Sequence, residues 1–290
     1  MCILYNESYY LLGDKTADCK TACDMHQCLP TAHDNHALLG FMINKLAEQS
    51  TPCSITRMSP ISSSIAYQDM GTLECQLPQY NSQPANQCIE RVFNSKHLCR
   101  CSNSVGICDL MLLKTVEQLY TKPGHITAKT EKAYGNGTTE IATIAFVASG
   151  FGVTCEDACD FHYGSACDKY YISTTADVLF WNTHPVLSML CGRPGYCNVS
   201  QKHSFDDDPS CGLDNTCHGF SNQTWNYNGS ACGLNKLSNN NELCACYNIS
   251  YDHFTTTVSS RHSIWYPQTT TTNKGSTAPV TVKFTVDYET

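Results

Sequence analysis

The residues in this sequence best able to do chemistry are its cysteines, which number 20 among 290 residues. Closely spaced cysteines either oxidise to disulfides or, as thiolates, bind zinc. Zinc sites favour paired C-x2-C knuckles, and this sequence has none; its short spacings are C-x3-C, starting at Cys19 and Cys155, and C-x-C, starting at Cys99 and Cys244. We therefore expect disulfides, and with them an oxidising, extracellular location, either secreted or at the cell surface.

Eight cysteines recur in the same order in each half of the chain. Residues 18–26 and 154–162 share the pattern C-x2-A-C-D-apolar-H, and each half later carries one C-x-C. Recurrence of this kind predicts two tandem homologous repeats, at residues 1–149 and 150–290. The first framework comprises Cys19, Cys23, Cys28, Cys53, Cys75, Cys88, Cys99 and Cys101, and the second comprises Cys155, Cys159, Cys167, Cys191, Cys217, Cys232, Cys244 and Cys246.

Four cysteines remain outside these frameworks, two in each half. They predict one private bridge per half, Cys2–Cys108 and Cys197–Cys211. Eight cysteines can pair in 105 ways, so the pairing within each framework stays open. Cysteines at positions i and i+4 of a helix share a face, so we expect the two members of each C-x3-C to bond elsewhere, and likewise those of each C-x-C.

The elements that must position these cysteines are short. Apolar spacing predicts helices at residues 18–27, 36–48, 86–96, 108–120, 155–162 and 176–190. Extended sequence at residues 126–134 and 138–148, joined by Gly135-Asn136-Gly137, predicts a hairpin that closes the first repeat. The fold class is therefore α+β and disulfide-rich, with short cysteine-bearing helices and a closing hairpin or small sheet in each repeat.

The C-terminal segment 279–288 alternates apolar and polar residues more regularly than any other. Its apolar face comprises Val280, Val282, Phe284, Val286 and Tyr288. Such a strand at the end of a chain either closes its own domain or adds to the sheet of a neighbouring copy.

The remaining surface is polar but weakly charged. Charged residues make up 15% of the chain and the formal net charge is −8, which argues against nucleic-acid binding. No apolar run reaches the roughly 18 to 20 residues of a membrane span. Covalent glycans are an expected modification, because six N-glycosylation sequons are present, at Asn6, Asn136, Asn198, Asn222, Asn228 and Asn248.

Other chemistry has weaker support. His26 and His162 follow the C-x3-C pairs and could complete zinc sites if the cysteines were reduced, and Asp206 to Asp208 could bind calcium. The chain lacks G-x-S-x-G, H-E-x-x-H and glycine-rich phosphate motifs. We expect no catalytic residue, cofactor or metal.

These features favour an extracellular, glycosylated structural protein that assembles with copies of itself, as a filament or surface layer, through extended terminal segments. One alternative is a secreted lectin-like or adhesin module, whose exposed aromatics would stack on sugars. Its candidate aromatics are Trp225, Tyr227, Trp265 and Tyr266. A secreted hydrolase is the second alternative.

Overall fold

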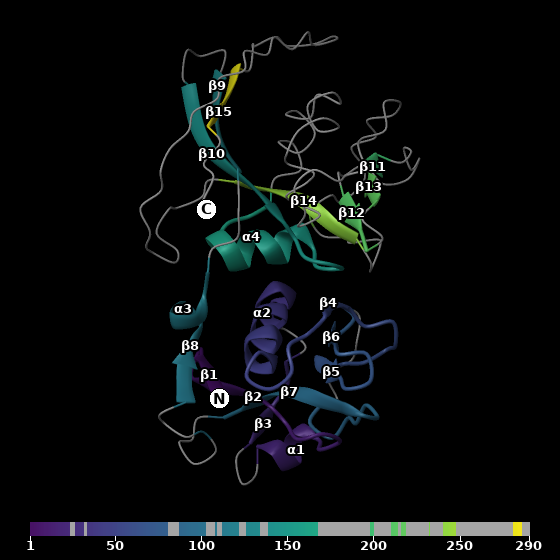
Figure 1. The fold of residues 1–290 in the computed structure, drawn as a ribbon. Coiled ribbons are helices and arrows are strands. Elements are labelled where there is room, and N and C mark those ends of the chain that lie inside the picture. Colours follow the sequence, from purple (N-terminus) through teal and green to yellow (C-terminus); the bar gives the residue numbers. More distant parts are fainter. Residues whose placement is uncertain are drawn as a thin grey trace. The chain divides into compact units, whose positions relative to one another are not determined.

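The fold consists of two compact mixed α/β units with small sheets tied by disulfides (Figure 1). Unit 1 comprises Met1–Thr121 with Gly150–Val153, and unit 2 comprises Lys122–Ser149 with Thr154–Thr290. Within the part of the chain that is described, every helix is too short or too polar to cross a bilayer. The computed structural model describes residues 1–23, 27–31, 34–80, 87–102, 108, 112–121, 126–133, 139–167, 198–199, 210–213, 216–218, 232, 240–247 and 281–285.

Unit 1 is built on an eight-stranded sheet in the order β4-β6-β5-β7-β2-β1-β8, with β3 also paired to β7. The long strand β7 is its centre, because β2, β3 and β5 all pair with it antiparallel. The strands are β1 (Cys2–Tyr5), β2 (Ser8–Leu12), β3 (Cys28–Leu29), β4 (Ile55–Met58), β5 (Tyr67–Asp69), β6 (Glu74–Leu77), β7 (Ser95–Cys101) and β8 (Leu113–Thr115).

The first hairpin, β1–β2, turns through two residues with positive φ. Tyr5 pairs with Ser8, which leaves Asn6 (φ 44°) and Glu7 (φ 58°) as the turn. Two successive positive φ values are the signature of the hairpin turn whose twist matches that of the strands, and asparagine tolerates this conformation well. The sequon residue Asn6 is therefore held at an exposed turn.

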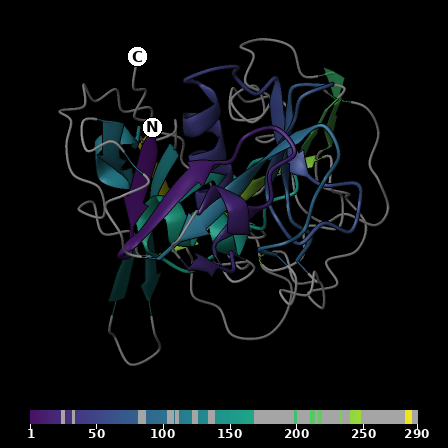
Figure 2. The same ribbon diagram turned by 90° about the horizontal axis from the view of Figure 1, so that it is seen from below.

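The helix α2 (His36–Ala47) contributes more buried apolar side chains than any other described element of unit 1. Its N-cap is Asn35, whose side-chain oxygen accepts hydrogen bonds from the amides of Ala37 and Leu38. Leu39, Met42 and Ile43 are fully buried. The helix packs on β1, β2, β4, β5 and β6, and Figures 1 and 2 show it beside the strands of unit 1. The short helix α1 (Cys19–Ala22) packs on β7.

Two helices expected in this unit do not form. Residues 87–94 are turns and irregular chain leading into β7, and residues 112–120 comprise strand β8 and the single-turn helix α3 (Val116–Leu119). The strand β8 pairs in parallel with β1, from Cys2↔Leu113 to Leu4↔Thr115. The apolar spacing of residues 108–120 was compatible with a helix, but pairing with a distant strand overrides a weak local preference.

Unit 2 contains a seven-stranded sheet in the order β11-β13-β12-β14-β10-β9-β15, with the C-terminal strand at one edge. Its helix, α4 (Cys155–Tyr163), ends at Gly164 in the left-handed conformation. The strands are β9 (Ile126–Ala133), β10 (Thr139–Ala148), β11 (Asn198–Val199), β12 (Ser210–Gly212), β13 (Thr216–His218), β14 (Asn240–Tyr247) and β15 (Thr281–Thr285). The expected helix at 176–190 lies outside the described residues.

The hairpin β9–β10 forms as expected, but it belongs to unit 2. Strand β10 pairs antiparallel with β14 over five residues, from Ile144↔Tyr247 to Ala148↔Leu243. Residues 122–149, which carry this hairpin, therefore belong to the second compact unit. Each hairpin precedes the cysteine-bearing helix of its own unit, since β1–β2 leads into α1 and β9–β10 leads into α4.

Candidate functional site

The most distinctive local structure is a pair of disulfides that fastens α1 to β7. Cys19 bonds to Cys99 and Cys23 to Cys101, with Cα atoms 5.1 and 5.5 Å apart. Four residues of helix advance about 6 Å and two residues of strand about 6.7 Å, so a C-x3-C helix lies in register with a C-x-C strand. Neither motif bonds internally, as predicted. We call this arrangement the double staple.

The start of α1 is fixed by a carboxylate. Asp18 is the N-cap, and its Oδ1 accepts a hydrogen bond of 2.8 Å from the amide of Thr21. Its Oδ2 forms an ion pair with Arg91 at 2.8 Å. These hydrogen bonds, first those from Thr21 and then those from Arg91, lower the pKa of Asp18 to about 2. The cap therefore stays ionised under all ordinary conditions.

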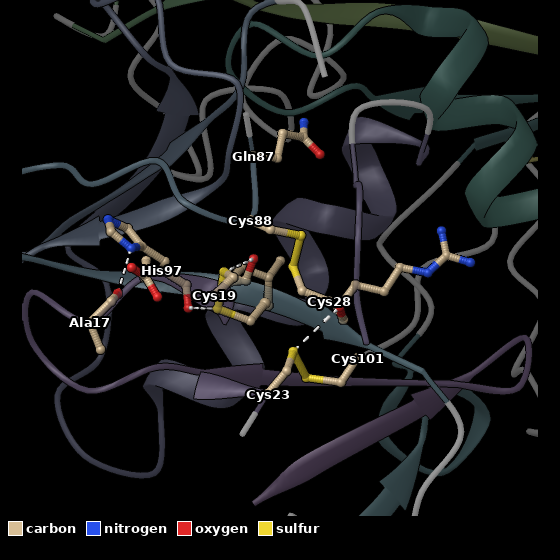
Figure 3. Close-up of a disulfide and its surroundings, with 12 residues drawn as sticks. Ala17, Cys19, Cys23, Cys28, Gln87, Cys88, His97 and Cys101 are labelled. Carbon is tan, nitrogen blue, oxygen red and sulfur yellow. Dashed lines mark hydrogen bonds between the residues drawn. A yellow bond between two sulfur atoms is a disulfide. The ribbon is translucent and has the colours of Figure 1, made fainter. Parts of the chain in front are cut away.

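A third disulfide and a buried histidine complete the surroundings of the staple (Figure 3). Cys28 bonds to Cys88. The ring of His97, two residues before Cys99, is buried, with Nδ1 2.9 Å from the carbonyl of Ala17 and Nε2 3.0 Å from the amide nitrogen of Val92. Nδ1 is then the donor and Nε2 the acceptor. Burial lowers the pKa of His97, so the neutral ring serves as a structural connector.

Unit 2 contains a double staple with the same connectivity. Cys155 bonds to Cys244 and Cys159 to Cys246, each with Cα atoms 5.1 Å apart, and Cys167 bonds to Cys232. Thr154 caps α4 through its hydroxyl, which accepts from the amide of Asp157, at the position that Asp18 occupies in unit 1.

Backbone contacts around the two staples also correspond. The amides of Lys20 and Glu156, each one residue after the first helix cysteine, donate at 2.8 Å to the carbonyls of Cys88 and Cys232. The strand beside each C-x-C strand has the same register, with Leu11↔Cys99 in unit 1 and Val147↔Cys244 in unit 2. Leu11 and Val147 each lie eight residues before their helix cysteine.

The two units differ at the residue between the C-x-C cysteines. In unit 1 it is Arg100, which forms an ion pair of 3.0 Å with Asp34, while the hydroxyl of Tyr10 donates to the same carboxylate at 2.9 Å. In unit 2 the corresponding register pair is the apolar Phe146↔Ala245. Burial, and next the charge of Asp34, raise the pKa of Tyr10, so the phenol stays protonated and is no nucleophile. This network ties the chain around Asp34 to the sheet.

The predicted private bridge Cys2–Cys108 is present, with Cα atoms 5.8 Å apart, and Cys53 bonds to Cys75. These bridges bring the described disulfides to eight, and no cysteine in the described part of the chain is free. Cys211 is disulfide-bonded as well. Its predicted partner Cys197 lies outside the described residues, as does Cys191, and Cys217 is described only as backbone in β13.

Metal and glycan predictions fall mostly outside the described residues. The disulfides of Cys19, Cys23, Cys155 and Cys159 exclude these sulfurs as thiolate ligands, and no cluster of three or more metal-binding side chains occurs among the residues described. His162 lies beside the rings of Phe161 and Tyr163. His26, Asp206 to Asp208, the four candidate sugar-stacking aromatics and the sequons Asn136, Asn222, Asn228 and Asn248 lie outside the described residues, while Asn198 begins β11.

The C-terminal strand is the remaining predicted site. Its described part, β15, pairs antiparallel with β9, from Thr281↔Glu131 to Thr285↔Thr127. Val282 and Phe284 lie within this strand, whereas Val280, Val286 and Tyr288 are outside the described residues. The geometry thus offers covalent rigidity and an edge strand. Comparison with family models, characterised proteins and solved structures finds no match for this chain.

Proposed function

We propose that the protein is an extracellular structural subunit, built from two homologous disulfide-stapled repeats, that joins to further copies by placing its terminal strand on β9 of a neighbour. The observation that carries the proposal is the position of β15, which forms the outer edge of the unit 2 sheet and is attached to β9 by a backbone ladder.

The matching staples support the repeat. Three disulfides link corresponding cysteines in both units, and the helix caps, amide contacts and strand register correspond as well. The repeat begins with its hairpin: β1–β2 leads into α1 as β9–β10 leads into α4. A covalently fixed repeat is suited to bearing load, because its unfolded state is strongly restricted.

The density of bridges supports an extracellular location, since reducing compartments keep thiols free. Asn6 is exposed at the tip of the β1–β2 turn, where an attached glycan would displace no packed side chain. Glycans at such turns would cover the outer surface of the assembly.

The contrast between the two sheet edges supports exchange at β15. In unit 1 the outer hairpin strand β1 pairs with β8, and the Cys2–Cys108 bridge links the segment before β8 to β1. In unit 2 the corresponding strand β9 is covered by β15, more than 140 residues further along the chain, and no bridge involves either strand among the described residues. Backbone ladders form equally well within a chain or between chains, so β15 of one copy can occupy β9 of the next.

Head-to-tail exchange of this kind does not close on itself unless the rotation between copies allows a ring, so filaments are the expected product. Electron microscopy of the purified chain should show filaments, and a variant lacking residues 279–290 should be monomeric. Monomeric full-length protein at high concentration would overturn the proposal.

A second measurement does not depend on the truncated variant folding. Lys129 and Lys283 are register partners on β9 and β15. Full-length protein is prepared in normal and ¹⁵N-labelled form, mixed under dissociating conditions, reassembled and treated with an amine-reactive cross-linker. Exchange predicts that about half of the Lys129–Lys283 cross-links join a light to a heavy peptide; intrachain pairing predicts that none do.

A further inference from the structure

Unit 1 carries a loop, residues 88–94, in which most residues are tied to the fold. Cys88 is bonded to Cys28, and its carbonyl accepts from the amide of Lys20. The carboxylate of Glu90 accepts from the hydroxyl of Ser63 at 2.9 Å and from the amide and hydroxyl of Ser64. These contacts fix the first half of the loop against other segments of unit 1.

The second half of the loop is fixed in the same way. Arg91 forms the ion pair with Asp18. The amide of Val92 donates to the buried ring of His97, and the hydroxyl of Ser95 donates to the carbonyl of Val92 at 2.6 Å.

The loop ends at Asn94, which has φ 56° and whose carbonyl accepts from the amide of Met70 at 2.9 Å. Asparagine is among the few residues that adopt this backbone conformation readily. Its turn places the preceding residue, Phe93, at the tip.

Two apolar residues of the loop are left in water. Phe93 is 92% exposed and Ile89 is 57% exposed, while a third apolar side chain, Ile61 at 49%, lies two residues before Ser63 on the segment that Glu90 holds. A single exposed apolar residue needs no explanation. Here, however, the polar contacts hold the backbone in a shape that displays two large apolar side chains at most about 14 Å apart along the chain.

We propose that this loop binds the surface of a lipid bilayer, with Phe93 and Ile89 inserted at the boundary between headgroups and acyl chains. Apolar side chains beside basic groups are the pattern of interfacial membrane binding. Two cations belong to this region: Arg91 within the loop, whose side chain is 65% exposed and ion-paired with Asp18, and the exposed Lys20, whose amide contacts the carbonyl of Cys88. Asp18 forms the ion pair with Arg91, and the carboxylate of Glu90 accepts hydrogen bonds from Ser63 and Ser64.

The size of the apolar surface favours lipid over a protein partner or a second copy. A stable protein interface buries about 800 Å² on each side. Two or three partly exposed side chains supply at most a few hundred Å². A bilayer demands no matching pocket, and a fixed loop loses little conformational freedom on insertion.

The test is co-flotation of the full-length protein with phosphatidylcholine vesicles, with and without phosphatidylserine. Burial of one phenylalanine changes a partition coefficient by on the order of 30-fold, so Phe93→Ala should lower vesicle binding by that factor, and Ile89→Ala by about 10-fold. Leu112→Ala removes another half-exposed apolar side chain of unit 1 and should leave binding unchanged. Equal losses for all three variants, or no binding of the unaltered protein to either vesicle, would overturn the proposal.

Tryptophan placement provides an independent readout. The Phe93→Trp variant should show additional tryptophan fluorescence that lipids brominated on the acyl chain quench. The additional fluorescence of the Leu112→Trp variant should not be quenched by these lipids. Absence of quenching for Phe93→Trp in vesicle-bound protein would also overturn the proposal. So would a Phe93→Ala variant that keeps vesicle binding but loses filaments, since this result assigns the loop to a protein contact.

Discussion

The double staple makes a quantitative prediction, because its two bridges are redundant. Cys19–Cys99 and Cys23–Cys101 are separated by only four residues on the helix and two on the strand. Once one bridge exists, the other closes a loop of roughly six residues, which corresponds to about 2 kcal/mol in the chain-entropy relation. Removing either bridge alone, as Cys19→Ala with Cys99→Ala or as Cys23→Ala with Cys101→Ala, should therefore lower the free energy of unfolding by about 2 kcal/mol.

Removing both bridges should cost more than twice this amount. With the staple gone, the nearest remaining bridge is Cys28–Cys88, nine residues from Cys19 and eleven from Cys99. Closing a loop of about 20 residues is worth about 3 kcal/mol, so the quadruple variant should lose about 5 kcal/mol in total. Paired alanine substitutions leave no free thiol and bury no new polar group.

The assay is equilibrium unfolding in guanidinium chloride without reductant, followed by circular dichroism. A matched control lies in unit 2, where Cys159→Ala with Cys246→Ala removes a bridge with the same four- and two-residue spacing and should also cost about 2 kcal/mol. If a single removal in unit 1 costs the 4 to 5 kcal/mol of an isolated loop of about 80 residues, the two bridges do not act as one staple.

Three further predictions concern charges. Burial lowers the pKa of His97, so the unfolded chain binds a proton at a pH at which the folded chain does not. The free energy of unfolding should therefore fall as pH drops below about 6.5. His97→Gln should reduce this dependence of the free energy of unfolding on pH, measured by urea titrations. Because the pKa of Asp18 is lowered, its carboxylate stabilises the fold above about pH 4, and this stabilisation is lost as pH falls towards 2. Asp18→Asn keeps the cap but not the charge, so this variant should be less stable than the unaltered protein above about pH 4 and equally stable near pH 2. Lys129 and Lys283 are register partners, and opposite charges at directly paired positions stabilise a ladder. Lys283→Glu should therefore strengthen the β9–β15 ladder by about 0.2 to 1 kcal/mol, measured by the filament critical concentration, and adding Lys129→Glu should cancel the gain.

Parts of the fold follow from residue types alone. The periodicity of residues 36–48 predicted α2 closely, since Asn35 caps it and its apolar face is buried. The sequence around Gly135-Asn136-Gly137 predicted the β9–β10 hairpin. The spacing of the C-x3-C and C-x-C motifs predicted that their members bond elsewhere, because neighbouring cysteines on one face of a helix or strand cannot reach each other.

Other parts depend on contacts between distant residues. Nothing local indicates that residues 113–115 pair with β1, or that β10 pairs with β14 about 100 residues later. The apolar residues around Phe93 have helical spacing and predict a helix at residues 86–96, where the structure has a loop. The observed shape of the loop depends on contacts with more distant residues, and no sequence pattern predicts these contacts. The residues are Ser63, Ser64, Met70 and His97.

The pairing of the cysteines in unit 2 tests the account most directly, because the proposed function rests on the proposal that the two units are homologous repeats. Correspondence with Cys53–Cys75 predicts a Cys191–Cys217 bridge, which leaves Cys197 for Cys211. Mass spectrometry of peptides from a non-reduced digest should recover both bridges and find ten in all. A Cys211–Cys217 bridge between these directly opposed strand residues, or free thiols at these positions, would contradict the repeat.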